Sequence, residues 1–179
     1  MKTKNTQAVS LKIAGTRTRF IAQAAMTATL YIVLTYIANA FGLANYAVQV
    51  RFSEALTILP CFTSAAVPGL FIGCLLSNIL TGCALPDIIF GSLATLLGAL
   101  GTYALRRWKW CAPLPPILAN TVIVPFILIY GYGLVIEGLS TLQCYGYYCL
   151  SVGAGEVISC GILGMLLFSV LHKYKNRIF

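Results

Sequence analysis

Residues 87–110 read DIIFGSLATLLGALGTYALRRWKW. The run between Asp87 and Arg106 carries no charge, and its 18 residues match the roughly 17–25 residues of a membrane-spanning helix. Arg106, Arg107 and Lys109 follow it beside two tryptophans, as is typical of a membrane interface. Because short basic loops stay in the cytoplasm, the stretch predicts a transmembrane helix that ends on the cytoplasmic side.

Charge is sorted in the same way along the whole chain. Eleven of the twelve Lys and Arg residues fall in three clusters, at 2–19, 106–109 and 173–177. The four acidic residues are Glu54, Asp87, Glu137 and Glu156. Threading the chain back and forth through a bilayer puts the basic clusters on one face and the acids on or near the other. We therefore expect both termini in the cytoplasm and an acidic mouth outside.

Composition places the chain among integral membrane proteins. It is 59% hydrophobic and only 9% charged over 179 residues, which is too apolar for a soluble surface. The net charge of +8 comes from residues that flank apolar segments, so nucleic-acid binding is not expected. We predict an all-α fold of six transmembrane helices, at about 20–41, 52–66, 70–82, 88–105, 117–136 and 149–171.

The second and third of these helices are the shortest, and a re-entrant hairpin in their place would keep the same topology. Residues 44–51 are expected as an outer connection and residues 137–148 as a Tyr-rich outer loop. The predicted organisation is a basic cytoplasmic arm at 1–19, a transmembrane domain at 20–172 and a basic cytoplasmic tail at 173–179.

Glu156 is the strongest candidate for a ligand-binding residue. It lies about eight positions into the last predicted helix, roughly 10–12 Å below the outer surface at 1.5 Å per residue. Because a carboxylate costs energy inside a bilayer, it indicates a functional site, or else an internal pair with a cation such as Arg51. Arg51 and Glu54 are three positions apart at the start of a helix and can touch each other. Arg51 is equally suited to orienting Glu54 or Glu156.

Other polar residues gather toward the same outer side. Asp87 suits the first turn of a helix, either as a cap or in a binding site. Asn78 lies near mid-membrane, where a buried amide needs partners from another helix or a ligand. Tyr130 and Tyr132 fit an interfacial girdle, although some of these rings could stack on a flat ligand.

Several kinds of site find no support in the sequence. There is no G-x-x-x-x-G-K-[ST] run, so the chain cannot hydrolyse nucleotides by the P-loop route. The single histidine, His172, stands among lysines at the expected cytoplasmic end, and no metal or cofactor site is predicted. Cys144 and Cys149 are close enough in sequence to form a disulfide, and two free thiols fit the same spacing. Asn120 is expected to pack against a neighbouring helix.

Small residues mark a candidate helix contact on the first predicted helix. Ala24 and Ala28 are four positions apart, a spacing that lets two helices approach closely. Either packing within the chain or contact with a partner protein fits this pair.

Four blocks of sequence resemble one known family. Residues 50–60 read VRFSEALTILP, residues 66–78 AVPGLFIGCLLSN and residues 86–96 PDIIFGSLATL, and Gly155-Glu156 follows in the last helix. They are similar to the QueT group, which are substrate-binding S components of energy-coupling factor transporters assigned to queuosine precursors. The resemblance covers nearly the whole chain from Phe20 onward.

This resemblance implies a six-helix S component in the bacterial plasma membrane, without enzymatic activity of its own. It implies partners as well: a transmembrane coupling subunit, contacted through Ala24 and Ala28, and two cytoplasmic ATPases. The implied ligand is a 7-deazaguanine base, whose edge Glu156 or Glu54 would accept in a cavity lined by Asn78 and Asp87. The alternatives are another small vitamin or nucleobase as the substrate, a small membrane enzyme, or an assembly subunit that binds no small molecule.

Overall fold

The computed structural model describes residues 2–42 and 51–178, and within these residues every regular element is a helix. The described elements are α1 (Lys2–Ala40), η1 (Phe52–Cys61), α2 (Ala66–Leu80), η2 (Asp87–Gly91), α3 (Ser92–Ala104), η3 (Lys109–Cys111), α4 (Leu114–Phe126), η4 (Ile127–Gly131), α5 (Thr141–Glu156), η5 (Val157–Leu163) and α6 (Gly164–Ile178). Of these, η1 and η3 are 3₁₀ helices, and η2, η4 and η5 are π-helical turns that continue into their neighbours.

The all-α prediction is confirmed, and four helical segments are long and apolar enough to cross a membrane. They are Gly15–Ala40, Asp87–Ala104, Lys109–Gly131 and Thr141–Tyr174. The two segments predicted to be short are the shorter apolar helices, Phe52–Cys61 and Ala66–Leu80. Of the expected outer connection at 44–51, only Arg51 lies inside the described residues.

The last helix begins earlier than predicted. It starts at Thr141, so most of the Tyr-rich segment expected as a loop is helical instead. The reason is a capping box, in which the Ser140 hydroxyl accepts from the Gln143 N–H while the Gln143 side chain accepts from the Ser140 N–H. Such a pair satisfies donors that a helix start leaves open, and the Ser-x-x-Gln spacing is its sequence signal.

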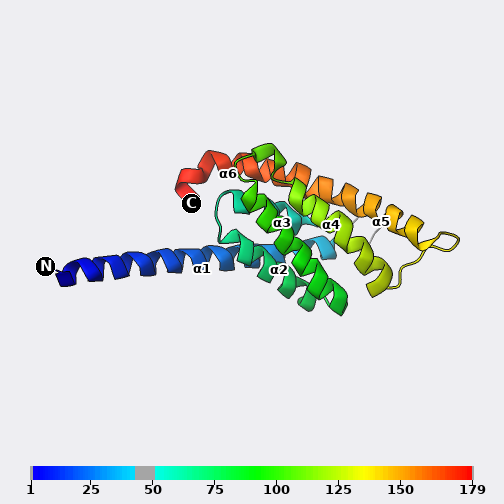
Figure 1. Ribbon diagram of the computed structural model, residues 1–179, viewed down its shortest axis with the longest axis horizontal. Coiled ribbons are helices and arrows are strands. Elements are labelled where there is room, and N and C mark those ends of the chain that lie inside the picture. Colours follow the sequence, from blue (N-terminus) through cyan, green and yellow to red (C-terminus); the bar gives the residue numbers. More distant parts are fainter. Residues whose placement is uncertain (1, 43–50, 179) are drawn as a thin grey trace.

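The charged connections segregate to opposite ends of the bundle. Figure 1 shows both termini at one end, together with the connection between α3 and α4 that carries the basic cluster at 106–109. The start of η2 at Asp87 and the connection between η4 and α5 lie at the other end. This arrangement agrees with the alternating path inferred from the charges. The first helix is longer than predicted, and its N-terminal part extends beyond the other helices (Figure 1).

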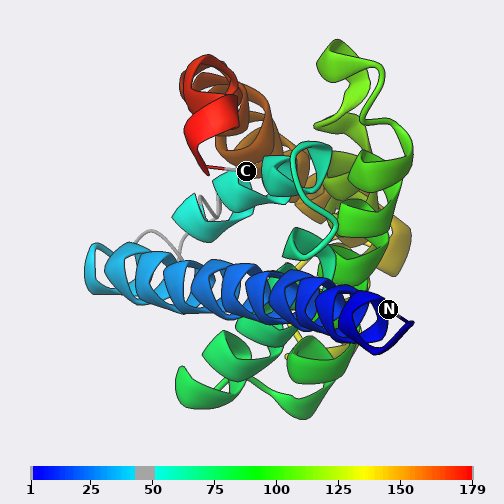
Figure 2. The ribbon, with the colours of Figure 1, turned by 90° about the vertical axis from the view of Figure 1, so that its left-hand side faces the viewer.

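The short 3₁₀ helix η1 forms the centre of the bundle. It contacts α1, α3, α6 and η5, and Figure 2 shows α1 running between η1 and α2. Residues 53–60 are all buried. A 3₁₀ helix rises about 2.0 Å per residue, so the ten residues of η1 extend roughly 20 Å, farther than an α-helix with the same number of residues. Its apolar side chains join Tyr31, Leu70 and Ala99 in the main core.

Close packing of small residues joins α1 to α2. A Cβ atom added to Gly69 would lie 2.6 Å from the Ala24 carbonyl oxygen, and one added to Gly73 would lie 3.0 Å from the Ala28 Cα. Ala24 is half-buried and Ala28 is buried. The close approach that small residues permit is therefore used within the chain, and a partner contact through this pair stays a prediction.

Replacing Gly69 with Ala is expected to destabilise the protein by about 1–3 kcal/mol, the usual cost of overpacking. The new methyl group would meet backbone atoms of α1, which cannot move aside as a flexible side chain can. Thermal unfolding in detergent measures the effect. Gly146→Ala is the matched control, since nothing lies within 4 Å of its added Cβ and Ala favours a helix. Equal unfolding midpoints for the two variants would contradict this packing.

Candidate functional site

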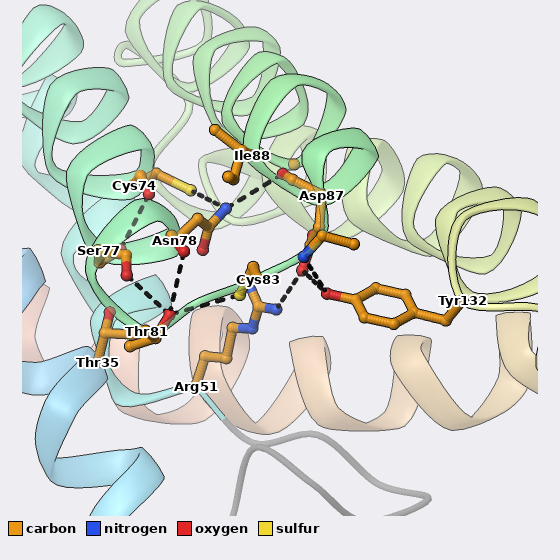
Figure 3. A network of polar contacts seen from close by, with 12 residues as sticks. Thr35, Arg51, Cys74, Ser77, Asn78, Thr81, Cys83, Asp87, Ile88 and Tyr132 are labelled. Carbon is orange, nitrogen blue, oxygen red and sulfur yellow. Dashed lines mark hydrogen bonds and ion pairs between the residues drawn. The ribbon is translucent and has the colours of Figure 1, made fainter.

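A cavity of about 260 Å³ lies at the end of the bundle that holds the start of η2. Its lining residues are Thr35, Ala38, Asn39, Arg51, Asn78, Thr81, Cys83, Asp87, Val124, Ile127, Leu128, Tyr132 and Leu134. The polar side chains come mainly from α1, α2 and the segment around Asp87 (Figure 3). Val124 of α4 and Ile127 and Leu128 of η4 supply an apolar wall. A cavity with one polar side and one apolar wall suits a flat molecule with a polar edge.

Asp87 is the central charge of this cavity. Its carboxylate lies 3.9 Å from the Arg51 guanidinium and accepts a hydrogen bond from the Tyr132 hydroxyl at 3.2 Å (Figure 3). The side chain caps no helix, although Asp87 occupies the first turn of η2, where a negative charge is favourable. The Asp87 side chain is 8% exposed, so a ligand in the cavity would meet the carboxylate where little water is present.

Asn78 holds the segment that carries Asp87 in position. Its amide nitrogen donates to the Asp87 carbonyl oxygen at 3.2 Å and to the Cys74 sulfur at 3.7 Å. The partner that this buried amide was expected to need is therefore the backbone of another element. Asn78 also borders the cavity. It therefore fixes the Asp87 backbone, and with it the Asp87 carboxylate, relative to the cavity wall.

A second, much smaller space lies beside Glu156. It measures about 10 Å³ and is bordered by Arg51, Gly91, Thr95, Asn120, Val124, Val152 and Glu156. The Glu156 carboxylate accepts from the Asn120 amide at 3.0 Å and from the Cys160 thiol at 3.2 Å. The neighbour expected for Asn120 is thus Glu156 itself. This space is large enough for about one water molecule.

Glu54 borders neither of these spaces. Its side chain is 1% exposed, one oxygen accepts from the Tyr31 hydroxyl, and the other has no hydrogen-bond partner among the described residues. Ligand atoms of Glu54, Glu156 and Cys160 lie within 4.8 Å of one another. Two carboxylates and a thiol are ligands that Zn²⁺ accepts. Among the residues that the structure describes, these three are the group that could hold a metal ion.

Arg51 forms an ion pair with Asp87 and not with Glu54, although Glu54 is closer to it in the sequence. It precedes η1 with an extended backbone, φ −103° and ψ 109°, so the i, i+3 geometry of a helix does not apply to it. Its side chain instead reaches across the cavity to η2. Arg51, Asn78 and Asp87 therefore meet at one site, with Glu156 beside it on the smaller space.

Tyr130 lies away from the cavity, and the tyrosine that lines the cavity is Tyr132. Tyr130 is 72% exposed and its ring stacks on Phe126 at 6.0 Å. The π-helical turn η4 changes the phase of the side chains at this point, which a constant helical period does not anticipate. Tyr132 follows that turn, lines the cavity and accepts a hydrogen bond from the Ala84 N–H at 3.1 Å.

Reasoning from the sequence missed four residues of the site with polar or thiol side chains. Thr35, Asn39, Thr81 and Cys83 line the cavity. Threonines and cysteines are ordinary inside transmembrane helices, so only their position relative to Asp87 distinguishes them. The cysteines suggested as a disulfide, Cys144 and Cys149, are both free in the structure.

Tyr132→Phe is expected to lower the free energy of unfolding by about 1 kcal/mol, because it removes the hydrogen bonds of the hydroxyl. Burial raises the pKa of Tyr132 to about 12. The folded protein thus holds this proton more tightly than the unfolded chain, and the contribution is complete below about pH 10. Unfolding midpoints of both proteins from pH 6 to 9 should keep a constant difference. A difference that disappears by pH 8 would contradict the assignment.

Comparison with known proteins identifies a family. A family model described as QueT transporter matches residues 21–173 of the chain, a range that contains every residue of both spaces described above. No curated protein and no solved structure matches the chain.

Proposed function

The chain belongs to the QueT transporter family, and from this premise we propose that it is the substrate-binding subunit of an energy-coupling factor transporter. As a family member with four candidate spans it is a multi-pass membrane transport protein. The proposed cargo is a queuosine precursor, a 7-deazaguanine base. The proposed place is the bacterial plasma membrane, with both termini in the cytoplasm and the cavity facing outward.

One observation carries the proposal: a cavity of suitable size is built around a buried carboxylate at the end opposite the basic clusters. Its volume of about 260 Å³ lies just below the roughly 300–1,000 Å³ typical of small-molecule sites. Such a volume favours a single small bicyclic molecule. The basic clusters at the other end anchor that end in the cytoplasm, so the cavity would load its ligand from outside.

The chemistry of the cavity suits a deazaguanine base. Such a base presents an adjacent ring N–H and exocyclic amine, and one carboxylate can accept both bonds. Asp87 is the carboxylate that borders the larger cavity, so we assign the base edge to it. Val124, Ile127 and Leu128 would cover a ring face. Glu156, on the smaller space behind Arg51, would receive the cationic aminomethyl group that some of these bases carry.

Isothermal calorimetry on the purified protein tests the substrate. The panel contains a deazaguanine base with an aminomethyl group, the same base with a neutral methyl group, guanine, adenine and thiamine. We expect the two deazaguanine bases to bind most tightly and to raise the unfolding temperature in proportion to their affinity. Tighter binding of adenine or thiamine would replace the proposed substrate with another flat one. No binding of any member would refute the proposal.

Co-purification tests the proposed partners. The chain contains no P-loop sequence, so uphill import requires ATPases on other subunits. We expect a mild detergent to release the chain in complex with a membrane coupling subunit and two ATPases. The exposed side of α1 is a suitable surface for that contact, since Ala25 and Met26 face outward there. Purification of the chain without any ATPase, from membranes that import the base, would contradict this partnership.

A further inference from the structure

Arg51 separates the two spaces of the site. The larger cavity and the smaller space beside Glu156 share only Arg51 and Val124 among their lining residues. Gly91 borders the smaller space, and a Cβ atom added to it would lie 2.9 Å from the Asp87 carboxylate. Asp87 and its ion pair with Arg51 therefore stand at the boundary between the two spaces.

Arg51 makes a long, partly exposed ion pair with Asp87. The ion pair of its guanidinium with Asp87 spans 3.9 Å, and the side chain is 21% exposed. A tight charged hydrogen bond would measure about 2.7–2.9 Å. Arg51 also precedes η1 with an extended backbone, so its side chain can swing without unwinding a helix. A guanidinium offers five donors, and the described residues give it this single ion pair.

We propose that, in the ligand-free protein, the Arg51 guanidinium occupies the place of a positively charged ligand group. The cationic arm of a ligand displaces it in order to reach Glu156. This inference rests on the proposed function and makes Arg51 the residue that determines specificity for a positively charged ligand. Three acids, Glu54, Asp87 and Glu156, are the titratable carboxylates around it. Exchange of one cation for another preserves the charge of this buried group. A neutral ligand leaves Arg51 in place and occupies only the larger cavity.

The ligand-free protein supplies a direct test through Cys160. This thiol is 1% exposed and donates at 3.2 Å to the carboxylate of Glu156, which borders the smaller space together with Arg51. Iodoacetamide labelling, followed for each cysteine peptide by mass spectrometry, should be at least tenfold faster at Cys160 in Arg51→Ala than in the wild type. Cys144, which is 0% exposed and whose thiol donates to the Ile136 carbonyl oxygen and not to a residue that borders either space, is the internal control and should keep its rate.

An unchanged Cys160 rate in folded Arg51→Ala would overturn the proposal, as would an equal acceleration at Cys144. If Arg51→Ala does not fold, Asp87→Asn provides the second variant, because it removes the ion pair and keeps the guanidinium. Cys160 should then react at least threefold faster than in the wild type, and a wild-type rate would again overturn the proposal. Neither labelling result depends on which ligand the protein binds.

Ligand affinity in Arg51→Met separates this role from direct contact with the ligand. The aminomethyl base no longer has to displace a cation, so its affinity relative to the neutral methyl base should rise at least tenfold over the wild-type ratio. Arg51→Lys, which retains the charge, should leave that ratio within threefold of the wild type. Equal loss of affinity for both bases in Arg51→Met would mean that Arg51 simply binds the base, and would overturn the proposal. Absence of binding in the wild type would refute the proposed substrate instead, while the labelling result would stand.

Discussion

Asp87→Asn is expected to lower the affinity for both deazaguanine bases by about 10- to 150-fold. The substitution keeps the shape of the side chain but removes the negative charge that accepts the base edge. A hydrogen bond to a charged group contributes about 1.5–3 kcal/mol, and each 1.4 kcal/mol is a tenfold change in Kd. Because Asp87 is 6% exposed, little water is available to take over the lost bonds. Isothermal calorimetry with each base measures the change.

Glu137→Gln is the matched control for this experiment. Glu137 belongs to the connection between η4 and α5, which lies at the same end of the bundle (Figure 1), and it is exposed and does not line the cavity. Its substitution removes the same charge and should change the affinity less than threefold. Equal losses in the two variants would indicate long-range attraction by the acidic end in place of direct contact. Wild-type affinity in Asp87→Asn would remove Asp87 from the site.

Glu156→Gln is expected to affect only the ligand with a cationic arm. The affinity for the aminomethyl base should fall about 10- to 150-fold, by the same energy of a charged hydrogen bond. The affinity for the neutral methyl base should change less than threefold, since that base stays in the larger cavity. Calorimetry with the two bases gives both values on one protein sample.

The fold should survive this second substitution. The amide carbonyl that replaces the carboxylate can still accept from Asn120, which donates to Glu156 at 3.0 Å. Removing one of two neighbouring buried carboxylates also relieves an unfavourable desolvation. The unfolding temperature should therefore not decrease. Equal losses for the two bases would show that Glu156 holds the base itself, and no loss for either would exclude Glu156 from the site.

The sequence predicted the segregation of charge because that feature depends only on the order of residues along the chain. Asp87 precedes an uncharged span and the basic cluster at 106–109 follows it, so any alternating path places them at opposite ends. The bundle in Figure 1 has this arrangement. The same reasoning brought Arg51, Asn78 and Asp87 to one region without indicating how they pair.

Pairing depends on tertiary geometry that local spacing does not contain. Arg51 appeared to match Glu54 at i, i+3, but the helix begins only after Arg51 and the acid turns toward Tyr31. Tyr130 and Tyr132 were not distinguished from each other, because a constant helical period does not show how the π-helical turn η4 separates the two rings. The start of α5 was within reach of the sequence, since Ser140 and Gln143 have the spacing of a capping box.

Sidedness in the membrane tests the account most directly, because the ligand must reach the cavity from outside. Leu85 is 70% exposed near the cavity, and Trp110 is 86% exposed in the basic connection at the other end. Leu85→Cys and Trp110→Cys, each compared with the wild type to identify native thiols, are treated with a membrane-impermeant maleimide in right-side-out vesicles. We expect labelling at position 85 in intact vesicles and at position 110 only after permeabilisation. Labelling of both positions in intact vesicles, or of position 110 alone, would contradict the account.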